Sequence, residues 1–97
     1  MAMYVSLIKF TDQGIHNIKD TLRRHEAAMT EAEKMGMKII EPFWTMGAYD
    51  VVVLLDAPND ETMTAFALKV SSMGSVKTQT MRAFRRDEME GILAKIK

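Results

Sequence analysis

The chain has 97 residues, and its 13 basic and 13 acidic side chains give a formal net charge of zero. This balance argues against non-specific nucleic-acid binding and against attachment to a membrane surface, because both usually need a basic excess. The absence of cysteine excludes disulfides, thiolate metal sites and cysteine nucleophiles, and no apolar run approaches the ~20 residues that span a bilayer, so we expect a cytoplasmic protein.

The first predicted elements are a strand and a long helix. Residues 3–10 are rich in apolar and aromatic side chains and predict a strand. The apolar spacing then becomes helical as far as Met35, with Thr11 or Asp12 as the N-cap and Gly36 as the residue that ends the helix. One stripe of this helix, which we expect to face the core, carries Ile15, Ile18, Leu22, Met29 and Ala32.

Two further strands are predicted around a turn at Gly47-Ala48. Residues 37–46 form the second strand, and Pro42 belongs at an edge or a bulge because it cannot donate a ladder hydrogen bond. Residues 49–56 form the third strand. Its run Val51–Leu55 is apolar at every position and does not alternate, so both of its faces must be covered.

The second half of the chain predicts a helix, a strand and a tail helix. Asn59 or Asp60 caps the helix, which ends near Gly74. Residues 76–84 alternate as a fourth strand, and residues 86–97 form a short amphipathic helix. The fourth strand places Val76, Thr78, Thr80 and Arg82 on one face and Lys77, Gln79 and Met81 on the other.

This order predicts an α+β ferredoxin-like sandwich of βαββαβ topology, with two helices on one face of a four-stranded antiparallel sheet. We expect a single domain over residues 1–97, with the core in residues 1–85 and the C-terminal helix in residues 86–97. The second face of the sheet is then bare in a monomer. If six large apolar residues lie there, leaving them in water forgoes roughly 9–18 kcal/mol, which matches the whole stability of a typical domain.

The simplest cover for that face is a second copy of the chain, so we expect a homodimer or higher oligomer. The tail helix either lies on its own sheet or reaches across to a neighbour, and the sequence leaves both open.

The chain resembles the GYD-domain family of small bacterial and archaeal proteins, named for a Gly-x-Tyr-Asp motif that is here Gly47, Tyr49 and Asp50. The resemblance is carried by four blocks in order, namely residues 11–20, 44–50, 56–61 and 82–84. It implies the dimeric α+β barrel type of ferredoxin-like fold and no particular reaction, because the family is uncharacterised. Thr21-Leu22 stands where many members have a Ser-Pro break, so a more continuous first helix is expected here.

His25 is a candidate site residue because it falls on the predicted inner stripe of the first helix. It is either a proton-transfer or ligand-binding group in a pocket between helix and sheet, or a hydrogen-bonded histidine of the core boundary. His16 lies in the first turn and is expected to be exposed, without a role.

The motif residues Tyr49 and Asp50 point to opposite sides of their strand. In a functional interpretation, one of them lines a cavity with Trp44, and Tyr49 and Asp50 are also weak catalytic candidates beside His25. In a structural interpretation, Asp50 accepts hydrogen bonds from backbone N–H groups of the turn or of residues 17–19, and Tyr49 packs with its hydroxyl satisfied.

Lys9, Thr80 and Arg82 form either an anion site between the first and last strands or a set of solvated edge charges. No metal site is predicted, because the two histidines do not share a helix face, and no cofactor is predicted.

Three functions remain open: a small-molecule-binding or sensing module, with its pocket between the first helix and the sheet or at a subunit interface; a cofactor-free enzyme resembling the small monooxygenases or isomerases of the dimeric barrel superfamily; and a structural oligomer. The ligand-binding candidates are Trp44, Tyr49, His25, Arg82 and Lys9.

Overall fold

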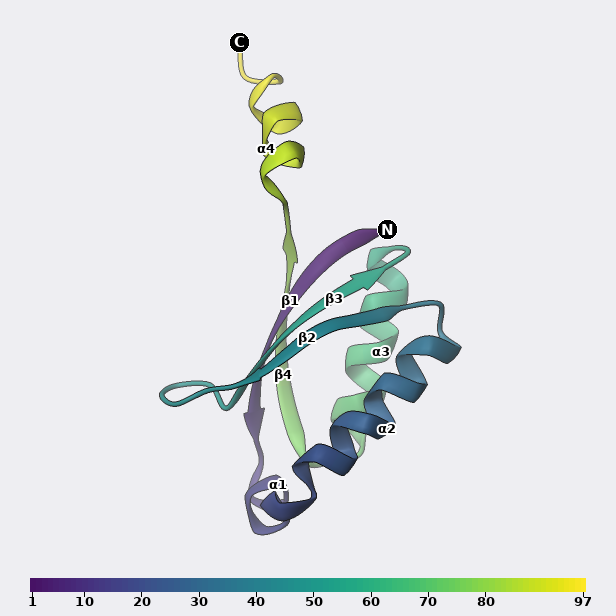
Figure 1. The fold of residues 1–97 in the computed structure, drawn as a ribbon, viewed down its shortest axis with the longest axis vertical. Helices are drawn as coiled ribbons and strands as arrows, with labels where there is room; N and C mark the ends of the chain where they lie inside the picture. Colours follow the sequence, from purple (N-terminus) through teal and green to yellow (C-terminus); the bar gives the residue numbers. More distant parts are fainter.

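The computed structural model describes residues 1–97. Its elements are β1 (Ala2–Phe10), α1 (Asp12–His16), η1 (Ile18–Asp20), α2 (Thr21–Lys34), β2 (Lys38–Trp44), β3 (Val51–Ala57), α3 (Asp60–Ser72), β4 (Val76–Ala83) and α4 (Arg86–Leu93). The strands form one antiparallel sheet in the order β2-β3-β1-β4, with α2 and α3 packed on the same side (Figure 1). The predicted ferredoxin-like sandwich is confirmed, and Pro42 lies on an edge strand, where its missing donor is tolerated.

The core lies between the sheet and the two helices. Along β3, alternate residues are buried against the helices, and Phe66 and Met63 of α3 pack on them. The buried apolar set is Tyr4, Ala32, Met37, Val51, Val53, Leu55, Ala57, Met63 and Phe66.

The opposite side of the sheet, which we call the open face, has no helix over it. Strand register aligns its side chains in rows: Phe43, Val52, Leu7 and Gln79 form one, and Glu41, Leu54, Val5 and Met81 the next. A third row holds Lys38, Asp56, Met3 and Ala83, and Lys9 pairs with Lys77 at the far end. The middle of the open face is therefore apolar, as the unbroken apolar run of β3 predicted.

The first helical region is broken, so the predicted single helix and its greater continuity are both wrong. Asn17 has φ −105° and ψ 35°, outside the helical region, and separates α1 from η1. Side chains satisfy the carbonyl groups freed by the break: Asn17 Nδ2 donates to Gln13 O, and Arg24 Nη1 donates to Asn17 O at 2.8 Å. These polar contacts replace the helical hydrogen bonds that would otherwise continue the helix.

The predicted inner stripe of α2 is wrong except for Ala32. Leu22 is 61% exposed and Ile15 54% exposed, whereas the helix turns Ala28 and Ala32 toward the sheet. The buried side is displaced by roughly 100°, the rotation of one residue. Because alanine is small, it lets the helix backbone approach a covered face already filled by valine, leucine and phenylalanine, and the larger side chains are left outside.

The predicted helix boundaries hold at three positions. Thr11 Oγ1 accepts from Gly14 N at 3.2 Å, and Asn59 Oδ1 accepts from Thr62 N at 2.8 Å, so both are N-caps. Gly36 follows α2 with φ +73°, the left-handed conformation that ends helices.

Helix α4 projects beyond the end of the sheet and packs on neither face (Figure 1). It ends at Leu93, before the predicted Lys97. The long axis of the molecule measures 52 Å and the radius of gyration 14.6 Å, against about 12–13 Å for a compact chain of this length. No helix combines the length and the hydropathy needed to cross a bilayer.

Gly14→Ala is expected to destabilise the fold by about 1–3 kcal/mol. A Cβ there would collide with the carbonyl oxygen of Ser75, which cannot yield easily because it accepts a hydrogen bond from Thr11 N at 3.0 Å. Urea unfolding measures the loss. Gly91→Ala is the control, since its Cβ would meet open space, and it should stabilise α4 slightly. Equal stability of Gly14→Ala and the wild type would contradict this packing.

Candidate functional site

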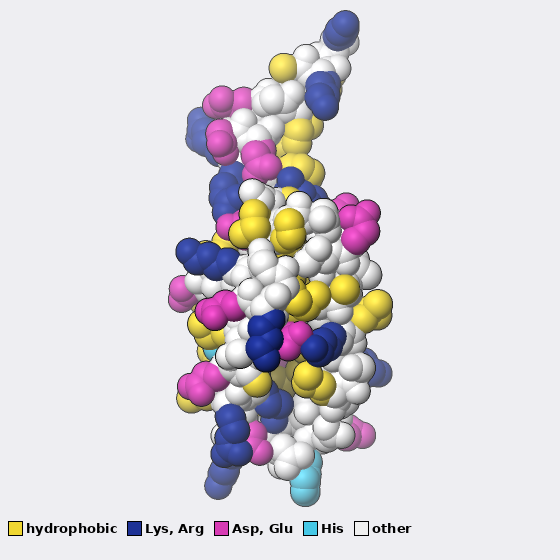
Figure 2. Space-filling view, turned by 90° about the vertical axis from the view of Figure 1, so that its right-hand side faces the viewer, with side chains coloured by type: hydrophobic (Ala, Val, Ile, Leu, Met, Phe, Trp, Pro, Cys, Tyr) yellow, Lys and Arg dark blue, Asp and Glu magenta, His cyan; other side chains and the backbone are white.

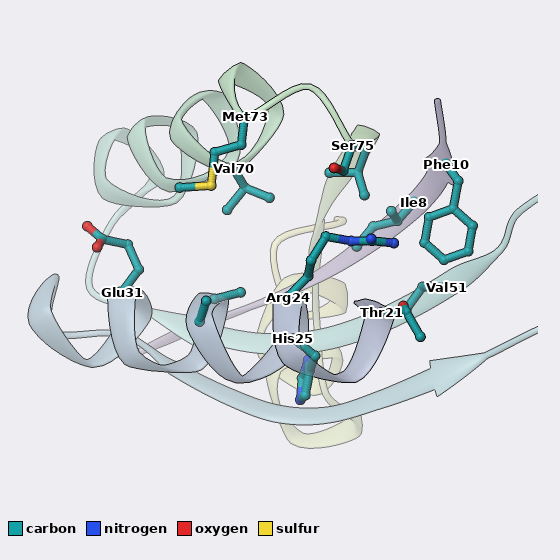
Figure 3. A pocket seen from close by; sticks show the side chains of 13 residues that line it. Ile8, Phe10, Thr21, Arg24, His25, Glu31, Val51, Val70, Met73 and Ser75 are labelled. Carbon is teal, nitrogen blue, oxygen red and sulfur yellow. The ribbon is translucent and has the colours of Figure 1, made fainter. Parts of the chain in front are cut away.

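A cavity of about 170 Å³ lies between α2, α3 and the helix-covered face of the sheet (Figure 3). Its lining is mainly apolar and comes from both helices and from strands β1, β3 and β4. The lining residues are Ile8, Phe10, Thr21, Arg24, His25, Ala27, Ala28, Glu31, Val51, Val70, Met73, Ser75 and Val76. The cavity occupies the position predicted for a ligand pocket, between the first helix and the sheet.

Arg24 brings a positive charge to this cavity. Its side chain extends from α2 toward Ile8 and Phe10 (Figure 3), and its guanidinium carbon lies 5.7 Å from the centre of the Phe10 ring. Nη2 also donates to Gly14 O at 3.3 Å. A guanidinium has five N–H donors, so the two bonds to backbone carbonyls leave donors for a further acceptor.

Glu31 supplies the opposite charge at the other end of the cavity. Its carboxylate pairs with Lys69 Nζ of α3 at 2.5 Å, which bridges the two helices. The hydrogen bond from Lys69 lowers the pKa of Glu31. Figure 2 shows charged side chains of both signs interspersed over this side of the molecule.

His25 lies at the edge of the cavity and contacts Trp44 of β2. The two rings meet edge to face, with centroids 5.7 Å apart and planes at 76°. Trp44 Nε1 donates to Thr21 Oγ1 at 3.0 Å. The side chains of α2 and β2 thus hold the tryptophan against the helix, and the structure brings together the sequence candidates His25 and Trp44.

The turn between β2 and β3 is fastened to β1 by Asp50. Its Oδ2 accepts from Phe10 N at 2.8 Å, and its own N–H donates to Ile8 O at 2.8 Å. Asp50 therefore makes backbone contacts, as the structural interpretation anticipated, although the donor is in β1 and not in the turn or residues 17–19. Gly47, with φ +106°, allows the turn to reverse.

Tyr49 does not join Trp44 in one cavity. Its hydroxyl donates to Gln79 Oε1 at 2.9 Å, and Lys9 Nζ lies 5.7 Å from the ring centre. Gln79 and Lys9 belong to the open face, so Tyr49 lies at the end of that face, whereas Trp44 is in register with Val51 on the covered side.

The structure also separates Lys9 from Thr80 and Arg82. Lys9 projects from the open face, whereas Thr80 is hydrogen-bonded to the buried Ser6 on the covered side. The Arg82 guanidinium lies 5.8 Å from the Tyr4 ring centre and 4.4 Å from that of Phe84. These three side chains do not converge on one anion.

A polar groove of about 500 Å³ between α3 and β4 was missed by sequence reasoning. Tyr4, Asp60 and Arg82 meet there, and the remaining lining residues are Met63, Thr64, Ala67, Leu68, Ser71, Thr78 and Thr80. The Tyr4 hydroxyl donates to Asp60 Oδ1. The available signal was the Tyr4 position itself, since a buried tyrosine hydroxyl usually needs a partner.

The Tyr4–Asp60 contact raises the pKa of the Tyr4 phenol above 10.0, chiefly through the hydrogen bond to the carboxylate and then through burial. No three His, Asp or Glu side chains lie close enough together to hold a metal ion.

The sheet order and the two helices on one side define a ferredoxin-like α+β domain. The family model of the GYD domain matches residues 4–93. The chain belongs to the GYD domain family.

Relatives and solved structures agree with this assignment. A Thermus thermophilus protein named "Glutamine synthetase and cystathionine beta-lyase binding protein" is 29% identical over 84 residues, which cover 86% of this chain and 88% of that protein. A crystal structure of a second protein described from Thermus thermophilus aligns with a TM-score of 0.56 and 22% identity over 88% of this chain and 95% of the other. That of a hypothetical protein from Pyrococcus horikoshii gives 0.56 and 19% over 89% and 93%. The two structures share the fold.

The Tyr4–Asp60 contact is expected to make stability fall at alkaline pH. The folded state raises the pKa of Tyr4, so its contribution is complete below the unfolded value near 10 and is lost as the pH rises through the folded value. Urea unfolding between pH 8 and pH 11 measures this decline. In Tyr4→Phe, which has no phenol at this position, the Tyr4 part of the decline should disappear. An identical pH profile for Tyr4→Phe and the wild type would contradict the assignment.

Proposed function

We propose that this protein is a homodimeric small-molecule-binding module whose ligand occupies the cavity between α2, α3 and the sheet. The observation that carries the proposal is an apolar cavity with one guanidinium directed across it. Ligand sites are typically apolar hollows with a few polar groups that fix orientation. Arg24 supplies such a group, and Thr21, His25 and Ser75 add hydrogen-bonding atoms to the lining.

The volume and the charge narrow the class of ligand. An apolar cavity of ~150 Å³ holds a benzene molecule, so about 170 Å³ suits a ligand with one ring or a short branched chain. Arginine binds carboxylates well because its planar donors match the two oxygens. A small apolar carboxylate therefore fits this site best.

The open face supports the homodimer. Val5, Leu7, Val52 and Leu54 form its apolar centre, and burial contributes roughly 1.5–3 kcal/mol for each large apolar side chain. A second copy with the same face supplies the cover, as is common in two-fold dimers.

The ligand site can be tested with 4-fluorobenzoate, followed by fluorine NMR and by Trp44 fluorescence. Ala28→Leu should weaken binding at least tenfold, because the larger side chain fills the cavity. Ala65→Leu, on the exposed side of α3, is the matched control and should bind like the wild type. Arg24→Met should reduce the preference for fluorobenzoate over fluorobenzene. Equal binding by Ala28→Leu and the wild type would exclude the cavity as the site.

A second candidate function is the binding of a metabolic enzyme. The name of the Thermus thermophilus relative supports it, and so does a row of exposed apolar side chains on the outer side of η1 and α2, formed by Ile18, Leu22 and Met29. Exposed apolar patches on small proteins often contact other proteins.

This second candidate is tested with purified glutamine synthetase from the same organism, using biolayer interferometry. Leu22→Asp with Met29→Asp should weaken binding by about 30-fold or more, as expected for the centre of an interface. Thr30→Asp, exposed on the same helix, should have little effect. The candidate fails if the wild type does not bind, or if all variants bind alike.

A further inference from the structure

Helix α4 is held in line with β4 by contacts at its first turn. Arg85 N donates to Glu88 Oε1 at 3.0 Å, and Arg82 Nη2 lies 3.3 Å from Glu88 Oε2. Both contacts lower the pKa of Glu88, the backbone hydrogen bond most. Arg85 also pairs with Asp56 at 3.4 Å. Because Arg82 lies on the covered side of β4, these contacts keep α4 from folding back over its own open face.

The apolar side of α4 therefore has no cover within its own chain. Leu93 is 56% exposed and Ile96 73% exposed. Met89 and Ile92 share this side of the helix, at spacings of three and four residues. The same chain thus carries two uncovered apolar surfaces, the open face and the projecting helix.

The charges of the open face distinguish the two ways in which two copies can pack sheet to sheet about a two-fold axis. If the axis runs along the strands, equivalent ends meet, and the Lys9–Lys77 pairs of both copies gather at one end. If the axis runs across the strands, opposite ends meet, and the lysine pairs lie far apart. Like charges placed opposite each other are destabilising, so the second arrangement is favoured.

The second arrangement also brings unlike charges together. The lysine pair lies at the end of the open face near Phe10 and Val76, whereas α4 follows Ala83 at the other end. With opposite ends together, the first turns of α4 approach the partner's lysines with the carboxylates of Asp87 and Glu90. The apolar side of the helix then extends over the end of the partner's sheet.

We infer that two copies pack open face to open face with opposed ends together, so that α4 of each copy covers the Lys9–Lys77 end of the other's sheet. This inference rests on the proposed homodimer and specifies its geometry. The neutral net charge of the chain leaves little overall repulsion to oppose the pairing.

Single-cysteine cross-linking tests the arrangement, because the chain has no native cysteine. Phe43→Cys on β2 and Met81→Cys on β4 lie at opposite edges of the open face. With opposed ends together, β2 faces β2 and β4 faces β4, so each variant should cross-link to itself with a bismaleimide that bridges sheets ~10 Å apart. Thr30→Cys, on the outer side of α2, is the control and should give no dimer.

The possible outcomes separate the proposals. A wild type that is monomeric in native mass spectrometry overturns the homodimer itself. A dimer that cross-links only when Phe43→Cys and Met81→Cys are mixed has the axis along the strands and overturns this inference alone. A dimer that gives no open-face cross-link pairs through another surface, which also overturns it.

A charge exchange tests the place of α4. Lys9→Glu with Lys77→Glu should raise the dimer dissociation constant about tenfold, since the contact occurs twice in the dimer. Adding Asp87→Lys and Glu90→Lys to the same chain should restore most of the affinity. A combined variant that dimerises no better than Lys9→Glu with Lys77→Glu contradicts the contact between α4 and the lysine pair.

Discussion

The sheet has apolar side chains on both sides, and the rest of the structure follows from this constraint. In β3, Val51, Val53 and Leu55 pack under the helices, while Val52 and Leu54 point the other way. A sheet of this kind needs two covering layers. The chain supplies only one, since α4 projects away from the sheet instead of covering it (Figure 1). Self-association is therefore a consequence of the strand sequence and needs no separate recognition motif.

Asp50 shows how a residue of the family motif acts through geometry. Its carboxylate and its backbone N–H both bond to β1, to Phe10 and Ile8, and fix the point where β3 begins. On either side of it, Trp44 is held against α2 and Tyr49 against the end of the open face. The motif thus connects the covered side and the open face at one turn, and its importance does not require a catalytic role for the carboxylate.

The four strands and the helix caps could be predicted from the sequence, because periodicity and capping depend on near neighbours. The buried side of α2 could not: its periodicity indicated Leu22, but the space left by the sheet admits only the smaller Ala28. The candidate sites were harder still, because their residues are far apart in the chain. Tyr4 and Asp60 are separated by 56 positions and meet only because β1 is a central strand beside the start of α3. Strand alternation, in turn, places Lys9 on the open face, away from the basic residue that it was expected to join.

The cavity and the open face are separated by one layer of strands. Val51 lines the cavity and Val52, the next residue, belongs to the open face. Close-packed interiors transmit small displacements because they have few voids to absorb them. A ligand that shifts Val51 must therefore move the backbone that also carries the dimer surface, so ligand binding and self-association act on the same short segment of β3.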